Sequence, residues 1–248
     1  MNRFVIPAVF VLTLTLLTPG CGGIMELRDR YWPTGPSEYE MKVTDKDLEK
    51  LQLELVQNIY PVDSQLYLLL RRLSVKDGYP AREWKENLVL NFPWISGVTV
   101  LDRESSVLSR YPGDGIKQLE YTPLFPRALD LPLGQTMLEV EETPFGPEVM
   151  LAVAVYQDFQ IEGLTVVHFD PRSFVAESAD PDEIVIICRG KVVWPGQYQE
   201  LQEALEQVEW MEIARKRISG KIELDKGSFF WFARAVGQDW LIYLLKDK

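Results

Sequence analysis

A long amphipathic stripe constrains the fold of this chain more than any other feature of its sequence. Apolar residues recur at alternating steps of three and four, at Leu48, Leu51, Leu55, Ile59, Val62, Leu66, Leu69 and Leu73. Because an α-helix turns once every 3.6 residues, this spacing keeps the side chains on one face. Thr44 and Asp47 resemble a capping pair at the start of that helix. We expect one long helix over residues 44–73.

The apolar face of this helix needs a partner, and two partners remain open. The chain's own sheets could cover the face. Alternatively, a second copy of the chain could pair with it, because the seam is heptad-like and suits a coiled coil. The sequence therefore leaves a homodimer through the helix 44–73 as one of two alternatives.

Short apolar runs rich in β-branched residues follow the helix and predict two groups of antiparallel strands. A polar stretch with three acids and a proline, residues 177–182, separates the groups. We expect the strands at residues 98–101, 107–108, 137–141, 148–156 and 161–169, and then at 184–188, 191–194, 221–225, 228–236 and 240–245. Two domains follow from this pattern, at residues 44–178 and 179–248.

The segments between these strands are also assigned from their composition. We expect helices over residues 81–90 and over about residues 197–210. Residues 111–134 are crowded with proline and glycine, which predicts irregular backbone.

The first residues are typical of an export signal and are set apart from the fold. Arg3 precedes an apolar run, Phe4–Leu17, that is too short to span a bilayer. The small-residue site that follows ends in Cys21 and resembles the bacterial lipobox. We expect residues 1–20 to be a signal peptide, Cys21 to be lipidated, and residues 21–43 to be a tether. An ordinary signal peptide cut nearby and an uncleaved anchor are the alternatives.

This reading places the protein in the cell envelope, on the periplasmic side, attached to the membrane through its lipid. Gly22 follows the cysteine. An aspartate at this position would resemble an inner-membrane retention signal, so its absence favours the outer membrane. Two or three acyl chains would make the attachment essentially permanent.

Charge and missing motifs exclude several function classes. Removing residues 1–20 changes the formal net charge from -11 to -12, because only Arg3 leaves. An acidic surface argues against nucleic acid as a partner. His168 is the only histidine. No stretch of the sequence has the residue spacing that a nucleophile elbow or a phosphate-binding glycine loop requires. We therefore expect no catalytic residues, no metal, no cofactor and no enzymatic activity.

Three segments carry a resemblance to a known family. Residues 93–102, 150–156 and 163–170, together with the order of helix and strands, resemble a double Cache domain, an extracytoplasmic relative of PAS domains. The resemblance covers about residues 44–247. It implies an α+β fold in which a long N-terminal helix precedes two PAS-like (Cache) modules with antiparallel sheets. It also implies that residues 75–175 hold a small ligand between a sheet and its loops, an amino acid, amine or carboxylate.

The resemblance also implies which residues would line that site. Asp170, at the end of a strand, matches the family's aspartate and would bind an amine, whereas Arg127 would bind a carboxylate. The family's Arg-x-Trp-Tyr segment is replaced here by residues 125–129, which lack the Trp-Tyr pair. Four aromatic residues would form the pocket wall: Trp94, Tyr111, Tyr121 and Tyr156. Core packing for the rings and structural pairing for the charged groups are the competing interpretations.

Together these features predict a lipid-anchored Cache-like sensor that has no output domain of its own and acts through an envelope or receptor protein. The alternative is a structural or interaction lipoprotein of the envelope with no small-molecule ligand.

Overall fold

The structure is a computed structural model of the 248-residue chain. It describes residues 46–247, except residues 74–77, 114, 159 and 225–226. The predicted signal peptide, Cys21, the tether and the capping residue Thr44 lie outside the described residues. Within the described part, no helix is long and apolar enough to cross a membrane.

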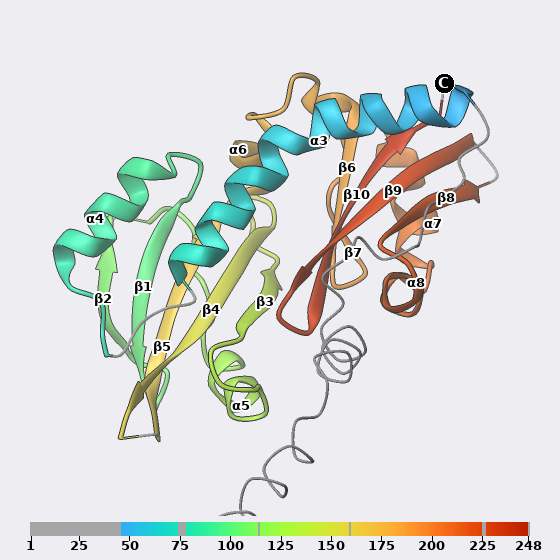
Figure 1. The fold of residues 1–248 in the computed structure, drawn as a ribbon. Coiled ribbons are helices and arrows are strands. Elements are labelled where there is room, and N and C mark those ends of the chain that lie inside the picture. The colour runs from blue at the N-terminus through green and yellow to red at the C-terminus, as the bar shows by residue number, and fades with distance from the viewer. Residues whose placement is uncertain (1–45, 74–77, 114, 159, 225–226, 248) are drawn as a thin grey trace, which may run out of the picture. The chain divides into compact units, whose positions relative to one another are not determined.

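The expected long helix is α3, Lys46–Leu73, which stays helical through Pro61 (Figure 1). Its apolar stripe is used within the chain, since five of its residues are buried in the largest core cluster: Ile59, Val62, Leu66, Leu69 and Leu73. That cluster also contains residues from both sheets. The chain's own sheets therefore cover this part of the stripe, and a homodimer would need another face of α3.

The first sheet has five antiparallel strands in the order β2-β1-β5-β4-β3. Its strands are β1 (Gly97–Asp102), β2 (Val107–Tyr111), β3 (Thr136–Glu141), β4 (Glu148–Gln157) and β5 (Gln160–Phe169). Helix α4 (Arg82–Asn91) precedes β1, α5 (Leu124–Leu129) lies between β2 and β3, and α6 (Pro171–Val175) follows β5. The predicted strands are confirmed, whereas α5 and α6 were not predicted.

The second sheet repeats this plan with the order β7-β6-β10-β9-β8. Its strands are β6 (Ile184–Cys188), β7 (Lys191–Trp194), β8 (Ser219–Leu224), β9 (Gly227–Val236) and β10 (Asp239–Lys246). The prediction of one helix over about residues 197–210 is wrong. The chain instead forms a 3-10 turn (Gln199–Leu201), α7 (Gln202–Glu206) and α8 (Trp210–Lys216).

A buried tryptophan marks the break between α7 and α8. The Trp210 Nε1–H donates to the carbonyl oxygen of Leu205 at 2.7 Å, and the ring lies in the second sheet's own core cluster. Helix α7 therefore ends at Glu206, and the Trp210 side chain packs in the core of the second sheet. The architecture as a whole is an α+β fold, with an N-terminal helix followed by two five-stranded antiparallel sheets, as predicted.

Candidate ligand-binding site

The two faces of the first sheet pack against different layers. Because side chains alternate along a strand, Val98, Val149 and Val167 lie in the cluster that contains α3. Leu101, Met150 and Val166 lie on the opposite face, in a separate cluster. The described residues of 112–135, which exclude residue 114, cover this second face, and we call them the covering segment. They contribute Tyr121, Leu124 and Ala128 to the second cluster.

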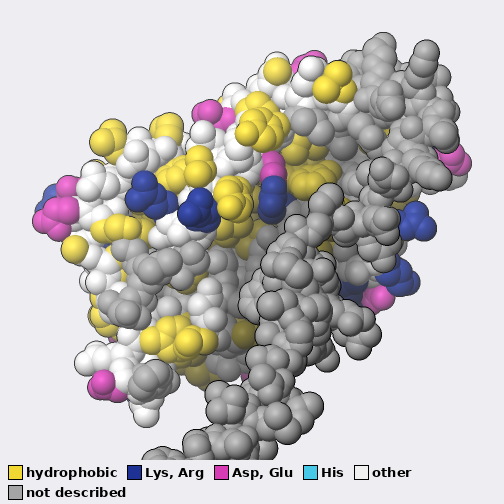
Figure 2. Space-filling model, viewed as in Figure 1, with side chains coloured by type: hydrophobic (Ala, Val, Ile, Leu, Met, Phe, Trp, Pro, Cys, Tyr) yellow, Lys and Arg dark blue, Asp and Glu magenta, His cyan; other side chains and the backbone are white. Residues whose placement is uncertain are grey.

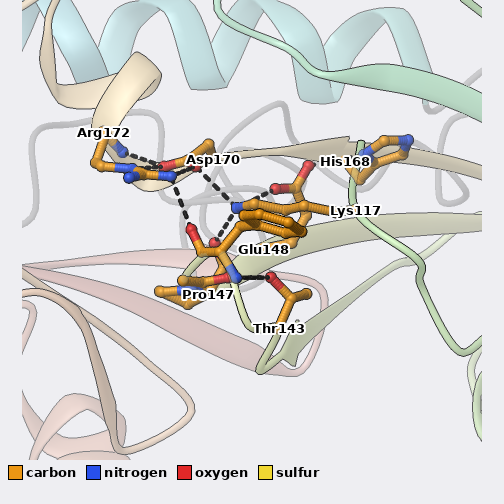
Figure 3. A network of polar contacts seen from close by, with 9 residues as sticks. Lys117, Thr143, Pro147, Glu148, His168, Asp170 and Arg172 are labelled. Atoms are coloured by element: carbon orange, nitrogen blue, oxygen red, sulfur yellow. Dashed lines mark hydrogen bonds and ion pairs between the residues drawn. The ribbon is translucent and has the colours of Figure 1, made fainter. Parts of the chain in front are cut away.

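The ammonium group of Lys117, from the covering segment, lies among three oxygen atoms (Figure 3). Its Nζ is 2.9 Å from the carbonyl oxygen of Pro147, 2.8 Å from Asp170 Oδ2 and 2.8 Å from Glu148 Oε2. The side chains of Lys117, Glu148 and Asp170 are only 12%, 1% and 14% exposed. Three segments distant in sequence therefore meet at one mostly buried cation.

Glu148 is the first residue of β4, and its carboxylate contacts both His168 and Lys117. Its Oε1 is 2.8 Å from His168 Nδ1 on β5, while its Oε2 faces Lys117. Burial alone would raise the pKa of Glu148, but hydrogen bonds with His168 and Lys117 outweigh it and lower the pKa. Glu148 is therefore held as a buried carboxylate. His168 Nε2 is buried and has no hydrogen-bond partner among the described residues.

Asp170 ends β5 and caps α6. Its Oδ1 accepts hydrogen bonds from the backbone N–H of Arg172 and from the Arg172 Nε, both at 2.9 Å. Arg172 Nη2 also bonds to Asp170 Oδ2 and donates to the carbonyl oxygen of Phe145 at 2.9 Å. Burial opposes ionisation of Asp170, but Arg172 and Lys117 lower its pKa to about 2.

A second polar group lies on the same face of the sheet, where Thr99 on β1 pairs with Arg110 on β2. The Tyr121 hydroxyl is 3.1 Å from Thr99 Oγ1 and accepts from Arg110 Nη2 at 3.5 Å. The guanidinium carbon of Arg110 lies 5.9 Å from the centre of the Tyr121 ring. Arg110 Nε is buried without a hydrogen-bond partner among the described residues. The group thus keeps one unused donor beneath the covering segment.

Two of the six predicted ligand-binding residues, Tyr121 and Asp170, lie in this polar layer. Trp94 does not, because it packs in the α3 cluster with its ring centroid 5.1 Å from Phe169 and 4.8 Å from Phe174. Tyr111 pairs with Val98 and so points to the face opposite Arg110. Tyr156 is half-buried at a bulge near the end of β4.

Arg127, the predicted carboxylate partner, is held by acidic groups of the chain. It bonds to Glu139 on β3 and reaches Asp239, in the second sheet, at 3.1 Å. Arg189, in the β6–β7 turn, contacts the same two carboxylates. We call these four residues the ion tetrad. Arg127 therefore joins the first sheet's helix α5 to the second sheet.

Sequence reasoning missed Lys117, Glu148, Thr99 and Arg110. Glu148 carried a signal, because a carboxylate directly precedes the apolar run of β4 and would need a buried partner. Nothing in the sequence marks Lys117, which lies in an irregular, proline-rich segment.

The described residues outside this layer offer little that could bind a ligand. They contain no group of three or more histidine, cysteine, aspartate or glutamate side chains able to hold a metal ion. Cys188 is free and fully buried, and burial raises the pKa of its thiol far above the ordinary value. A surface hollow of about 280 Å³ lies between α8 and β8, with Lys216, Arg217 and Trp231 among its lining residues.

Comparison with known proteins finds no matching family model and no matching curated protein. Solved structures do match. An extracellular ligand binding receptor from Desulfohalobium retbaense is 18% identical with a TM-score of 0.47, over 80% of this chain and 39% of the receptor. This chain thus spans well under half the length of that receptor.

Two chemoreceptor domains are similar as well. The ligand binding domain of the Pseudomonas aeruginosa amino acid chemoreceptor PctB, in complex with L-Gln, is 16% identical with a TM-score of 0.47, over 76% of this chain and 86% of that one. The ligand-binding domain of the Pseudomonas fluorescens chemoreceptor CtaA, in complex with L-leucine, is 12% identical with a TM-score of 0.45. The match covers 81% of this chain and 96% of that domain.

Proposed function

We propose that this chain is a lipid-anchored, extracytoplasmic Cache-like protein that binds a small organic carboxylate between its first sheet and the covering segment. The observation that carries the proposal is the buried Arg110 Nε, an unused donor beside the Tyr121 hydroxyl. A buried donor without a partner costs about 1–3 kcal/mol, so a ligand oxygen that bonds to it recovers that free energy on binding.

The chemistry around Arg110 favours a carboxylate. A guanidinium binds carboxylate oxygens in a planar, charge-assisted geometry. Thr99 and Tyr121 add hydroxyl groups, and Leu101, Met150 and Val166 supply an apolar wall on the same face. A carboxylate with a small apolar body fits this combination. Binding requires the covering segment to move, since its own side chains pack on this face.

A thermal-shift and calorimetric screen tests the proposal. The full chain, purified in detergent, is titrated with mono- and dicarboxylates, amino acids, amines and nucleobases. A carboxylate at 100 times its dissociation constant should stabilise the fold by about 2.7 kcal/mol. Arg110→Gln should abolish this response. Arg82→Gln should retain it, because Arg82 is exposed on α4 and pairs with Glu86.

The lipid anchor forms a separate part of the proposal. Cys21 follows a small-residue site that resembles a lipobox, and dual acylation would hold the chain in a membrane. Cys21→Ser should move the protein from the detergent phase to the aqueous phase in a phase-separation assay. Retention of the variant in the detergent phase would contradict lipidation at this position, and density-gradient fractionation of the wild type would test the outer-membrane assignment.

An interaction protein of the envelope is the second candidate, and exposed hydrophobic residues on α3 favour it. Leu53, Tyr60, Tyr67 and Leu68 are each about half exposed or more, and Figure 2 shows hydrophobic side chains along this helix. Such residues would suit a second copy of the chain or an envelope protein. Two results together would favour this function: no compound in the screen stabilises the protein, and sedimentation shows a dimer that Tyr60→Glu abolishes.

A further inference from the structure

We propose that Lys117 is a built-in occupant of a primary-ammonium site in the first module, formed by Glu148, Asp170 and the carbonyl oxygen of Pro147. The inference deepens the proposed function and rests on it for its biological meaning. The module supplies the ammonium from its own chain. While Lys117 is in place, these three oxygens are not free to accept hydrogen bonds from the amine of a ligand.

The geometry around Lys117 is that of a bound ammonium. A primary ammonium carries three N–H donors. Lys117 Nζ donates hydrogen bonds to the Pro147 carbonyl oxygen and to Asp170 Oδ2, and it forms an ion pair with Glu148 Oε2 at 2.8 Å without a well-directed hydrogen bond. Two of these oxygens belong to carboxylates. Two segments, residues 147–148 and Asp170, thus converge on one nitrogen atom, as they would on the amine of a small ligand.

The oxygens are held in place without help from Lys117. Glu148 is fixed by the β4 ladder and by His168 at 2.8 Å. Asp170 is fixed by its hydrogen bonds to the Arg172 backbone and guanidinium. The Thr143 hydroxyl, which donates to the carbonyl oxygen of Gly146 at 2.6 Å, closes the turn before Pro147. Removing the ammonium therefore leaves a preformed set of acceptors.

Lys117, in contrast, lies outside the regular secondary structure. It belongs to neither a helix nor a strand, and it follows a glycine-containing stretch of the covering segment. Its neighbours Ile116 and Gln118 are exposed. Lys117 takes no part in the hydrogen bonds between the strands, so its substitution leaves the strand pairing of the sheet intact.

Rescue of Lys117→Ala by small amines tests this inference in the full chain. The variant should unfold at a lower temperature than the wild type, because the buried Glu148 and the partly buried Asp170 lose a counter-charge. Methyl-, ethyl-, propyl- and butylammonium should raise its melting temperature by about 3 °C or more at saturation. Tetramethylammonium at the same ionic strength should not, since it has no N–H donor.

Three controls separate this effect from general salt binding. Wild type should not respond to the amines, because Lys117 fills the site. Lys221→Ala should not respond either, since Lys221 pairs with Asp247 at an exposed position. The double variant Lys117→Ala/Asp170→Asn should lose most of the rescue. If Lys117→Ala fails to fold, Lys117→Met keeps the apolar stem and should respond to ammonium and methylammonium.

An equal response of wild type and variant, or an equal effect of tetramethylammonium, would overturn the inference and leave Lys117 as a structural ion pair. The amine assay uses no natural ligand. Failure of the carboxylate screen would therefore count against the proposed function alone, and failure of amine rescue against Lys117 alone.

Discussion

Asp170 was predicted to bind the amine of a ligand, and in the structure its partners are groups of the chain itself. Its position at the end of β5 suggested an amine ligand, and in the structure it does face an ammonium, that of Lys117. The ammonium belongs to the chain, so binding of a ligand amine by Asp170 stays a prediction. Sequence alone gives no access to this pairing, because Lys117 and Asp170 lie 53 residues apart.

The low pKa of Asp170 predicts a loss of stability in acid. Its carboxyl has a pKa of about 2 in the folded protein against an ordinary 3.8. A lowered pKa stabilises the fold fully above the unfolded value, and this contribution is lost as pH falls from about 4 to about 2. At 1.36 kcal/mol per unit, the contribution is about 2 kcal/mol.

Urea unfolding of wild type and Asp170→Asn at several pH values checks this prediction. The difference in unfolding free energy between them should shrink by about 2 kcal/mol from pH 5 to pH 2. High salt should reduce the difference, since Arg172 is 60% exposed. Curves that stay parallel over this range would show that Asp170 does not carry the effect.

Trp94 belongs to the core, and this position determines what its substitution does. The ring packs edge-on against Phe92 and Phe169 and is 4% exposed. Trp94→Ala should therefore lower the unfolding free energy by about 3–5 kcal/mol, whereas Trp94→Phe should cost much less. Calorimetric unfolding measures both. A stable Trp94→Ala variant that has lost only ligand binding would instead place Trp94 in the pocket wall.

At the scale of elements, long periodic segments could be predicted and short helices could not. Helix α3 and the long central strands follow from hydrophobic period, because they bury apolar side chains, whereas β2 and β8, at the sheet edges, have no buried residue. Helix α5 has six residues with Pro126 inside, in a segment whose composition indicates irregular backbone. Helix α6 did carry a signal, since Asp170 caps it and Pro171 is its first residue. The break before α8 depends on Trp210 reaching the core, which is a tertiary effect.

Helix α3 is fixed to the second sheet by a partly buried ion pair. Asp63 Oδ1 accepts from Arg234 Nε at 2.7 Å, and a second contact joins Asp63 Oδ2 to Arg234 Nη2. Asp63→Ala should lower the unfolding free energy by about 2–3 kcal/mol, because it leaves the guanidinium without its bidentate partner. Urea unfolding provides the measurement.

The double variant Asp63→Leu/Arg234→Met serves as the control for this pair. Apolar replacement of both partners often restores stability, since neither charge is left buried. We expect the double variant to be more stable than Asp63→Ala. The opposite order would mean that Arg234 stabilises the fold through its contacts with Tyr67 and Phe232 rather than through Asp63.

At the scale of the whole molecule, the covering segment is connected to the second sheet through charge. Arg127 belongs to α5 within that segment, and Asp239 is the first residue of β10, next to the β9–β10 turn. The β9–β10 turn also approaches the backbone of β3, where a side chain on Gly237 would meet the carbonyl oxygen of Thr136 at 2.0 Å. Movement of α5 would therefore alter contacts of the second sheet.

A double-mutant cycle on Arg127 and Asp239 measures this connection. Both groups are partly buried and belong to the ion tetrad, so their coupling energy should be about 1 kcal/mol. The exposed pair Arg215–Glu212 within α8 should show a coupling near zero. Equal values for the two pairs would mean that the tetrad adds nothing to the stability of the fold. If the carboxylate found in the screen displaces the covering segment, its presence should weaken the Arg127–Asp239 coupling while leaving Arg215–Glu212 unchanged, because only the first pair includes a residue of that segment.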